Sequence, residues 1–357
     1  MTKSKKKLAK AKKCFHPHHP ICCIVPPHML REVIERGNAL QRAWAFQTLS
    51  LSERIRGRRE ALGNLLGITP AGEKRRTIYD AKNSTELPGK LVRGEGDPPS
   101  HDEAVNEAYD ATGATYDFFQ NIYGRNSIDD RGMRLDSTVH YDIQYDNAFW
   151  DGSQMVYGDG DGEIFQRFTK SIDVIAHELT HGVTQHEARL IYWGQPGALN
   201  ESFSDVFGTL VKQWLLQQTV EEADWIIGKE LFTPNINGVG IRSMQAPGTA
   251  YNDPVLGKDP QPAHVNDMYR GSEDNGGVHI NSGIPNYAFY IAAMEIGGYA
   301  WEKTGRIWYI TLRDRLRPWS NFKAAADRTI GVAEYIYGVN SKEQKAVRHA
   351  WEKVGVL

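Results

Sequence analysis

Apolar residues between positions 172 and 184 recur on nearly every side of a helical wheel, which predicts a helix packed inside the protein. They are Ile172, Val174, Ile175, Ala176, Leu179 and Val183, and no proline separates them. Two polar residues in this pattern, His177 and His181, are four positions apart. Because residues i and i+4 share one face of a helix, both imidazoles are expected to stand side by side.

The residues before position 77 show a weaker helical pattern. Pro26 and Pro27 open one helical segment, and residues 50–53 form a capping box that predicts the start of a second helix ending near Leu62. The polar stretch 67–76 contains Gly67, Pro70 and Gly72, which favour turns, so it is interpreted as a linker.

From residue 77 to about 170 the pattern predicts short strands and turns with one helix over 101–123. One strand is expected over 138–145, where Val139, Tyr141, Ile143 and Tyr145 alternate with more polar residues. After residue 184 the chain is mainly helical, with helices over 197–218 and in three stretches after residue 300. A β-rich part followed by a helical part predicts an α+β fold.

The histidine pair gives the helix its candidate chemistry. Two neutral imidazoles one turn apart can share a borderline-soft cation such as Zn²⁺, and Glu178 can reach a water on that metal without being a ligand. Zinc lowers the pKa of a bound water, and the carboxylate takes its proton as the water attacks a carbonyl. The alternative at this point is a helix that carries two histidines and no metal.

A catalytic zinc keeps three protein ligands, so the third must come from another element. Glu201 is the candidate, and Asp205 lies one turn further along the same face, where it can accept the free ring N–H of a ligand histidine. A lone Glu-x-x-x-Asp is more often a solvated helix face. Here apolar neighbours indicate burial, and buried carboxylates need partners. These neighbours are Leu199, Phe203, Val206 and Phe207.

Charge is unevenly spread along the 357 residues. The net charge is −2 in total, and the first 13 residues contribute seven lysines and no acid, so the rest of the chain carries −9. An acidic body argues against nucleic acid as the main partner. We expect the lysine-rich tail to be a solvated arm, with weak contact to nucleic acid or a membrane surface as the alternative.

The tail also lacks the apolar core and cleavage site of a secretory signal, and no run approaches the roughly 18 apolar residues of a membrane span. All three cysteines, Cys14, Cys22 and Cys23, lie in this region, so no disulfide is expected in the body. Together with neighbouring histidines they could hold a metal, but their spacing fits no standard structural zinc pattern.

Several stretches together resemble the thermolysin family of zinc metalloendopeptidases. The strongest are His177-Glu178-Leu179-Thr180-His181 and Gly197-Ala198-Leu199-Asn200-Glu201-Ser202-Phe203-Ser204-Asp205. Asn147-Ala148-Phe149-Trp150, the glycine–aspartate run 157–162 and the stretch 274–283 match in the same order. The similarity covers about residues 77–357. The extension with Pro26-Pro27-His28-Met29-Leu30 resembles the short propeptide of the protealysin-like branch.

The resemblance implies a thermolysin-like two-lobed fold with a short helical propeptide in front. The expected parts are a basic tail and propeptide at 1–76, a β-rich lobe that includes the His-Glu-x-x-His helix at 77–186, and a helical lobe at 187–357. The implied zinc ligands are His177, His181 and Glu201, with Glu178 as general base and proton shuttle.

Other roles follow from the same resemblance. Asp205 would orient His177, and Asn200 would lie near His181. His279, held in position by Asp274, would stabilise the oxyanion of the tetrahedral intermediate together with Tyr192. Preorganised donors of this kind are worth about 3 kcal/mol each.

The resemblance also implies a peptide-binding cleft. Asn147 and the backbone of Ala148 would pair with an extended peptide by β-augmentation, and Arg242 would bind the carbonyl that follows the cut. Cleavage before Leu, Ile, Phe or Val is expected, because the pocket for the residue after the scissile bond is apolar. Its implied residues are Phe165, Phe168, Val174, Leu231 and Ile241.

The sequence departs from the family at its paired-calcium site. Asp173 and Asp224 match the acidic ligands, but Lys212, Ile226 and Lys229 replace others. Lysine cannot bind Ca²⁺, and its ammonium can supply positive charge against Asp173 and Asp224 instead. We therefore expect one catalytic zinc and no paired calcium, and whether another calcium site exists stays open.

The favoured function is a zinc endopeptidase made as a zymogen, in which residues 1 to about 76 cover the cleft until self-cleavage. Leu65, Leu66, Ile68 and Ile78 are the candidate cleavage points. A non-catalytic metal-bound module and a nucleic-acid-binding protein are the competing hypotheses. We expect a monomer that acts on peptide or protein substrates. It would be secreted by a non-classical route, with a cytoplasmic location as the alternative.

Overall fold

The structure is a computed structural model that describes residues 23–56 and 73–357. Its helices are α1 Pro27–Arg36, α2 Ala39–Arg56, α3 Glu103–Tyr123, α4 Ile172–His186, α5 Gly194–Leu216, α6 Glu273–Asn281, α7 Gly283–Ile296, α8 Thr304–Ile310, α9 Phe322–Tyr337 and α10 Lys342–Lys353. Its strands are β1 Arg76–Ser84, β2 Lys90–Gly94, β3 Leu135–Tyr141, β4 Ala148–Trp150, β5 Gln154–Tyr157, β6 Ile226–Ile227, β7 Arg242–Ser243, β8 Asn252–Asp253 and β9 Gly257–Lys258.

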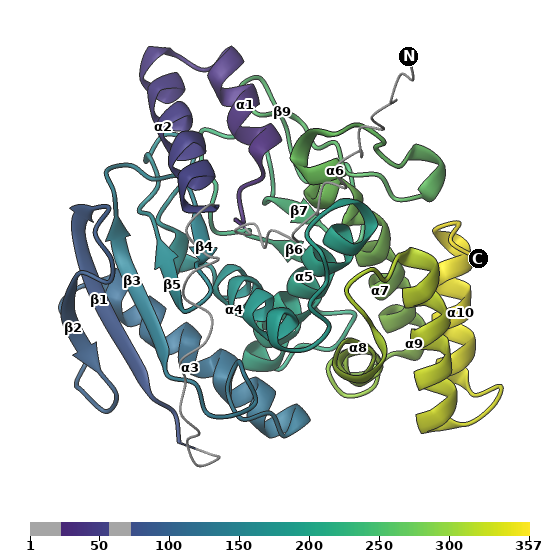
Figure 1. Cartoon of the computed structure of the whole chain (residues 1–357). Helices are drawn as coiled ribbons and strands as arrows, with labels where there is room; N and C mark the ends of the chain where they lie inside the picture. The colour runs from purple at the N-terminus through teal and green to yellow at the C-terminus, as the bar shows by residue number, and fades with distance from the viewer. Residues whose placement is uncertain (1–22, 57–72) are drawn as a thin grey trace, which may run out of the picture.

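The elements form a sheet-containing part and a helical part that meet at α4 and α5 (Figure 1). In this view the sheet lies at the left with α3 against it, and α7 to α10 lie at the right. The two N-terminal helices, α1 and α2, lie together at the top. The α+β fold predicted from the sequence is confirmed. Within the described residues, no helix combines the length and apolar character that a membrane crossing needs.

The main sheet has the strand order β2-β1-β3-β5-β4. The inner pairs β1–β3 and β3–β5 are parallel, whereas β2 and β4 join antiparallel at the two ends. The short end strand β4 packs against α4. Its outer edge forms a bridge from Phe149 to Cys23 of the N-terminal segment. One edge of the sheet therefore lies beside the helix that carries the histidine pair.

The two central helices are buried along most of their length, as the apolar pattern predicts. They pack closely because α5 carries a glycine at the contact. A Cβ on Gly208 would lie 2.5 Å from the carbonyl oxygen of Asp173 and 3.4 Å from Cβ of His177. Any larger residue at position 208 would push α5 away from the histidine-bearing face of α4.

The N-terminal segment departs from one prediction. Helix α1 begins at Pro27 as expected, but α2 begins at Ala39 and runs through the predicted capping box without a break. The hydroxyls in this region contact the body instead, since Thr48 accepts a hydrogen bond from the backbone N–H of Asp146, and Ser52 hydrogen-bonds Tyr145. Tertiary contacts outweigh the local capping signal here.

Two further predictions need correction. The strand predicted over 138–145 ends at Tyr141, because Asp142 and Gln144 beyond it adopt left-handed backbone conformations that interrupt the extended chain. Ile78 lies in β1 with no exposed surface, so it is excluded as a cleavage point in the folded chain. The Cys/His-rich stretch before Cys23 and the other candidate cleavage points lie outside the described residues.

Candidate active site

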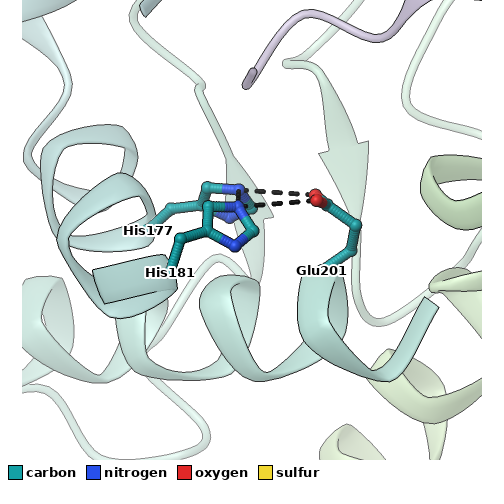
Figure 2. Close-up of side chains that lie close together, drawn as sticks. All are labelled: His177, His181 and Glu201. Carbon is teal, nitrogen blue, oxygen red and sulfur yellow. Dashed lines mark hydrogen bonds and ion pairs between the residues drawn. The ribbon is translucent and has the colours of Figure 1, made fainter. Parts of the chain in front are cut away.

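The two predicted ligand histidines lie on one face of α4 and point at Glu201 on α5 (Figure 2). Nε2 of His177 is 3.5 Å from Oε2 of Glu201, and Nε2 of His181 is 3.5 Å from Oε1. The two Nε2 atoms are 3.0 Å apart. All three side chains are buried, and one donor atom from each lies within 4.8 Å of the others. The distant carboxylate therefore meets both imidazoles at one point.

The opposite ring nitrogens of both histidines face oxygen acceptors. Nδ1 of His177 is 2.8 Å from Oδ1 of Asp205, and Nδ1 of His181 is 2.8 Å from Oδ1 of Asn200. An imidazole that donates its Nδ1 proton keeps a lone pair on Nε2, the nitrogen that faces Glu201. Oε2 of Glu201 is buried and has no hydrogen-bond partner among the described residues. Two imidazole lone pairs and a carboxylate oxygen that converge in this way fit Zn²⁺.

The carboxylates around His177 favour positive charge. Burial opposes protonation, but Asp205 and Glu201 together raise the pKa of His177 to about 9. Burial likewise opposes ionisation of Asp205, yet Arg242 and His177 hold the pKa of Asp205 at about 2. Surroundings that stabilise a proton on a buried imidazole will also stabilise a metal cation at the same place.

Glu178 lies next to the ligand face without belonging to it. Its Oε2 accepts a hydrogen bond of 3.2 Å from the backbone N–H of Trp150 in β4, and its Oε1 has no partner among the described residues. Burial raises the pKa of Glu178 to about 8. A carboxyl group whose pKa lies near neutrality can both accept and donate a proton during a reaction.

His279, Tyr192 and Asp274 form a second group beside Glu201. Nε2 of His279 is 3.1 Å from the hydroxyl of Tyr192, and that hydroxyl also donates to Oε1 of Glu201. Asp274 holds His279 through Nδ1 at 2.6 Å and through the backbone N–H at 2.9 Å. Burial opposes it, but Asp274 and Glu201 raise the pKa of His279. The imidazole is therefore fixed in orientation and favours the protonated, donor form.

The segment just before His279 is a distorted helix start. Asp274, Asn275, Gly276 and Gly277 all have left-handed backbone angles at the beginning of α6, and regular helix follows. Left-handed residues turn the chain sharply, which lets the Asp274 side chain fold back onto the N–H and ring of His279.

The predicted substrate-binding residues surround the N-terminal segment. Ala148 and Asn147 hydrogen-bond the backbone of Ile24 and Val25, and Arg242 donates to the carbonyl of Ile24. Every predicted pocket residue is buried and belongs to the same continuous apolar core as Ile24. These pocket residues are Phe165, Phe168, Val174, Leu231 and Ile241.

Sequence reasoning missed two residues of the site, Asn286 and Ser204, and one role of Arg242. Arg242 makes two 2.8 Å hydrogen bonds to Asp205, in addition to the predicted contact with a peptide carbonyl. Asn286 of α7 donates to Oδ2 of Asp205 at 2.8 Å, and the hydroxyl of Ser204 lies 3.0 Å from Nδ1 of His181. Nothing local marks Asn286, whereas the position of Ser204 beside Asp205 on a buried helix was an available signal.

Lys212, which replaces an acidic residue of the family's paired-calcium site, lies among acidic side chains near the N-terminal end of α4. Nζ of Lys212 is 3.3 Å from Asp173, 3.3 Å from Asp224 and 3.9 Å from Glu230, and 3.5 Å from the carbonyl oxygen of Ile226. Burial opposes it, but these acids raise the pKa of Lys212. The ammonium therefore lies where several oxygens converge.

Comparison with known proteins agrees with this geometry. Residues 70–185 match the thermolysin metallopeptidase catalytic domain, and residues 188–356 match the thermolysin metallopeptidase alpha-helical domain. An extracellular metalloprotease of Pectobacterium carotovorum subsp. carotovorum is 54% identical over 94% of this chain and 97% of its own length. Protease PrtS of Photorhabdus sp. (strain Az29) is 48% identical over 93% of this chain and 91% of its own length.

A solved structure extends the similarity to the N-terminal segment. The precursor of protealysin, a metalloproteinase from Serratia proteamaculans, is 55% identical, with a TM-score of 0.87. The match covers 94% of this chain and 100% of that one, so it includes propeptide as well as enzyme. The chain therefore belongs to the thermolysin family of metallopeptidases and is a zinc metalloendopeptidase in precursor form.

Proposed function

We propose that this endopeptidase hydrolyses internal peptide bonds before bulky apolar residues and that its N-terminal segment keeps it latent until it is removed. One observation carries the proposal. The groups expected to bind a substrate, Asn147, Ala148 and Arg242, hold the backbone of residues 24–25, beside the predicted zinc ligands. A segment of the chain thus occupies the place of a peptide substrate.

The catalytic roles follow from the contacts in the site. His177, His181 and Glu201 would hold the zinc ion, which when bound lowers the pKa of a water and polarises a carbonyl. Glu178 accepts the proton of the attacking water and delivers it to the departing amine, and its raised pKa suits both steps.

The charge that develops on the carbonyl oxygen needs donors fixed in advance. His279 and Tyr192 supply them, because their donor atoms lie 3.1 Å apart and face the same space beside Glu201. Asp274 keeps the His279 ring in this orientation. Asp205 orients the ring of His177 in the same way, and Asn200 orients the ring of His181.

Latency rests on contacts from the N-terminal helices to both parts of the enzyme. On the sheet side, Gln47 donates to Asp142 at 2.8 Å. On the helical side, Arg31 pairs with Glu273 at 3.3 Å, and His28 hydrogen-bonds Tyr251. A segment anchored on both sides of the cleft blocks it as long as the segment stays attached.

The proposal also covers the parts of the chain, the paired-calcium site, the oligomeric state and export. Residues 1–76 form the tail and propeptide, 77–186 the lobe with α4, and 187–357 the helical lobe. The paired-calcium site is absent, because Lys212 supplies the positive charge there. The protein acts as a monomer. It is exported, a proposal that the extracellular name of the Pectobacterium relative supports, and the proposed route is non-classical.

The test is the fate of the full-length chain with and without the general base. The wild-type protein should lose its N-terminal segment over time and gain the ability to hydrolyse casein. Removing the metal with a chelator should abolish casein hydrolysis until zinc is restored. A Glu178→Gln variant should stay full length and inactive, although it still binds one zinc per chain.

A peptide library supplies the specificity arm of this test. Products should begin with Leu, Ile, Phe or Val, and a profile dominated by charged residues after the cut would refute the apolar pocket. A protein that binds zinc but hydrolyses neither casein nor any library peptide would favour the non-catalytic module.

A further inference from the structure

Residues 23–25 contact the site through their backbone in consecutive order. The carbonyl oxygen of Cys23 is 3.1 Å from Nε2 of His279. The N–H of Ile24 donates to the carbonyl oxygen of Ala148 at 3.3 Å, and the carbonyl oxygen of Ile24 accepts from Arg242 at 3.1 Å.

The next residue continues the pattern. The N–H of Val25 donates to Oδ1 of Asn147 at 2.9 Å, and Nδ2 of Asn147 donates to the carbonyl oxygen of Val25 at 3.2 Å. Together with the antiparallel bridge between Cys23 and Phe149, these contacts extend the sheet past β4 by one short strand. The direction and position of this strand are fixed at every residue.

This arrangement places one particular peptide bond at the reacting centre. The carbonyl of Cys23 faces His279, the group proposed to stabilise a developing oxyanion. Its amide partner, the nitrogen of Ile24, is held by Ala148 on the opposite side. The side chain of Ile24 has no exposed surface and joins the apolar core that contains the proposed pocket.

The chain sequence suits cleavage at this bond. Neither Cys23 nor Ile24 is proline. Ile24 and Val25 each have a backbone N–H group, and each donates it to the cleft. Two prolines, which lack N–H groups, follow directly at positions 26 and 27, beyond the residues whose N–H groups the cleft binds. Pro27 then starts α1, whose buried residues anchor the downstream part on the enzyme.

We propose that the Cys23–Ile24 bond is a self-processing site, cut by the same molecule that carries it. This proposal rests on the proposed endopeptidase function, which supplies the attacking water and the general base. The water oxygen bonds to the carbonyl carbon of Cys23 as its proton passes to Glu178. The C–N bond then breaks and the Ile24 nitrogen takes that proton. The second proton of the water passes from the new carboxyl group to the same amine, so the products are a Cys23 carboxylate and an Ile24 ammonium.

The cut separates residues 1–23, with all seven lysines of the first 13 positions, from a propeptide that stays docked through α1 and α2. It is thus a different event from cleavage of the linker between propeptide and enzyme. An intermediate that begins at Ile24 and still contains α1 and α2 is its signature.

The experiment follows the intact mass of the full-length protein after zinc is added to metal-depleted material. We expect an intermediate beginning at Ile24 that forms with first-order kinetics, at a rate constant unchanged over a hundredfold range of protein concentration. Glu178→Gln should form none. Ile24→Asp should slow the cut by roughly thirtyfold or more, because it places a charge in an apolar environment. Ile24→Val and the exposed control Leu40→Ala should change it by less than about threefold.

A second readout does not depend on catalysis. In full-length Glu178→Gln, with and without zinc, hydrogen exchange should show the amides of Ile24 and Val25 protected, and Asn147→Ala should remove the protection at Val25. Unprotected amides in both states would overturn the inference.

The remaining outcomes separate the two proposals. A wild-type protein that hydrolyses casein while Cys23–Ile24 stays intact in every N-terminal fragment would overturn this inference and leave the endopeptidase function standing. A cut whose rate rises with protein concentration would also overturn it, because the bond would then be reached from another molecule. A zinc-loaded protein that neither hydrolyses casein nor cuts the Cys23–Ile24 bond would refute the proposed endopeptidase function itself.

Discussion

At the scale of single residues, Asp205 shows how the site is tied together. Its carboxylate accepts hydrogen bonds from His177, Arg242 and Asn286, which belong to three different elements. A buried carboxylate needs such partners, and in return it fixes the tautomer of the histidine and the direction of the guanidinium. One side chain therefore links the proposed metal ligand to the proposed peptide-binding arginine.

His140 allows a prediction about pH at the same scale. It lies on β3 between Asp159 and Asp102, with Arg167 and Lys170 lining the same pocket. The hydrogen bond to Asp159, against the opposing effect of burial and with further support from Asp102, raises the pKa of His140 from 6.5 to about 9. A raised pKa stabilises the fold fully below pH 6.5, and the contribution is lost as pH rises through 9.

We expect His140→Asn to lower the free energy of unfolding by about 2 kcal/mol at pH 6 and by much less at pH 9.5. Asparagine is the matched choice, because His140 has a left-handed backbone that asparagine tolerates. Denaturant unfolding of zinc-loaded Glu178→Gln, with and without the substitution, isolates the difference from other titrating groups. Equal losses at both pH values would show that the ion pair contributes nothing.

At the scale of elements, the contact between α4 and α5 decides the site and its surroundings. Gly208 allows the close approach that brings Glu201 to the histidines. Further along α5, Lys212 reaches Asp173 at the N-terminal end of α4 and the loop that carries Asp224. A cation held between elements can brace them, whether it is an ammonium or a metal ion.

Replacing Lys212 tests this bracing. Lys212→Met should lower the free energy of unfolding by about 3 kcal/mol, because it leaves the fully buried Asp173 without its counter-charge. Lys229→Met is the matched control, since among the described residues that exposed lysine pairs only with Asp224. Its replacement should cost less than about 1 kcal/mol.

A second substitution at position 212 tests calcium binding. Lys212→Glu adds a carboxylate to the acidic cluster, so its melting temperature should rise on adding calcium, whereas that of wild type should not respond at this site. A wild-type protein with two bound cations there, seen by anomalous scattering, would contradict the proposed loss of the paired site.

At the scale of the whole molecule, the N-terminal helices join the two parts of the enzyme across the active site (Figure 1). Met29 lies on the inner face of α1 with no exposed surface. Met29→Ala should weaken docking by about 3 kcal/mol and shorten the lag before casein hydrolysis at least tenfold, because the cleft would open more often.

The matched control for Met29 is Leu40→Ala, which removes an exposed side chain of α2. Lag times followed with a quenched fluorescent peptide should be unchanged in this control. If Met29→Ala showed the wild-type lag, docking of α1 would not limit activation.

Much of the site was predictable because its strongest signals are local. Helical spacing alone puts His177 and His181 on one face, and the burial pattern of α5 marks Glu201 and Asp205 as carboxylates that need partners. Local signals failed where long-range contacts were stronger. The capping box at residues 50–53 lies inside α2, where Thr48 and Ser52 contact the body instead.

The reactive groups, the helices that carry them and the family could be predicted from the amino-acid sequence, because they depend on residue identity and short-range periodicity. Which distant groups meet could be seen only in the folded protein. The packing brings Arg242 onto Asp205 and sets the carbonyl of Cys23 against His279. The physical reason is that these contacts join residues far apart in the chain, so they depend on how whole elements pack.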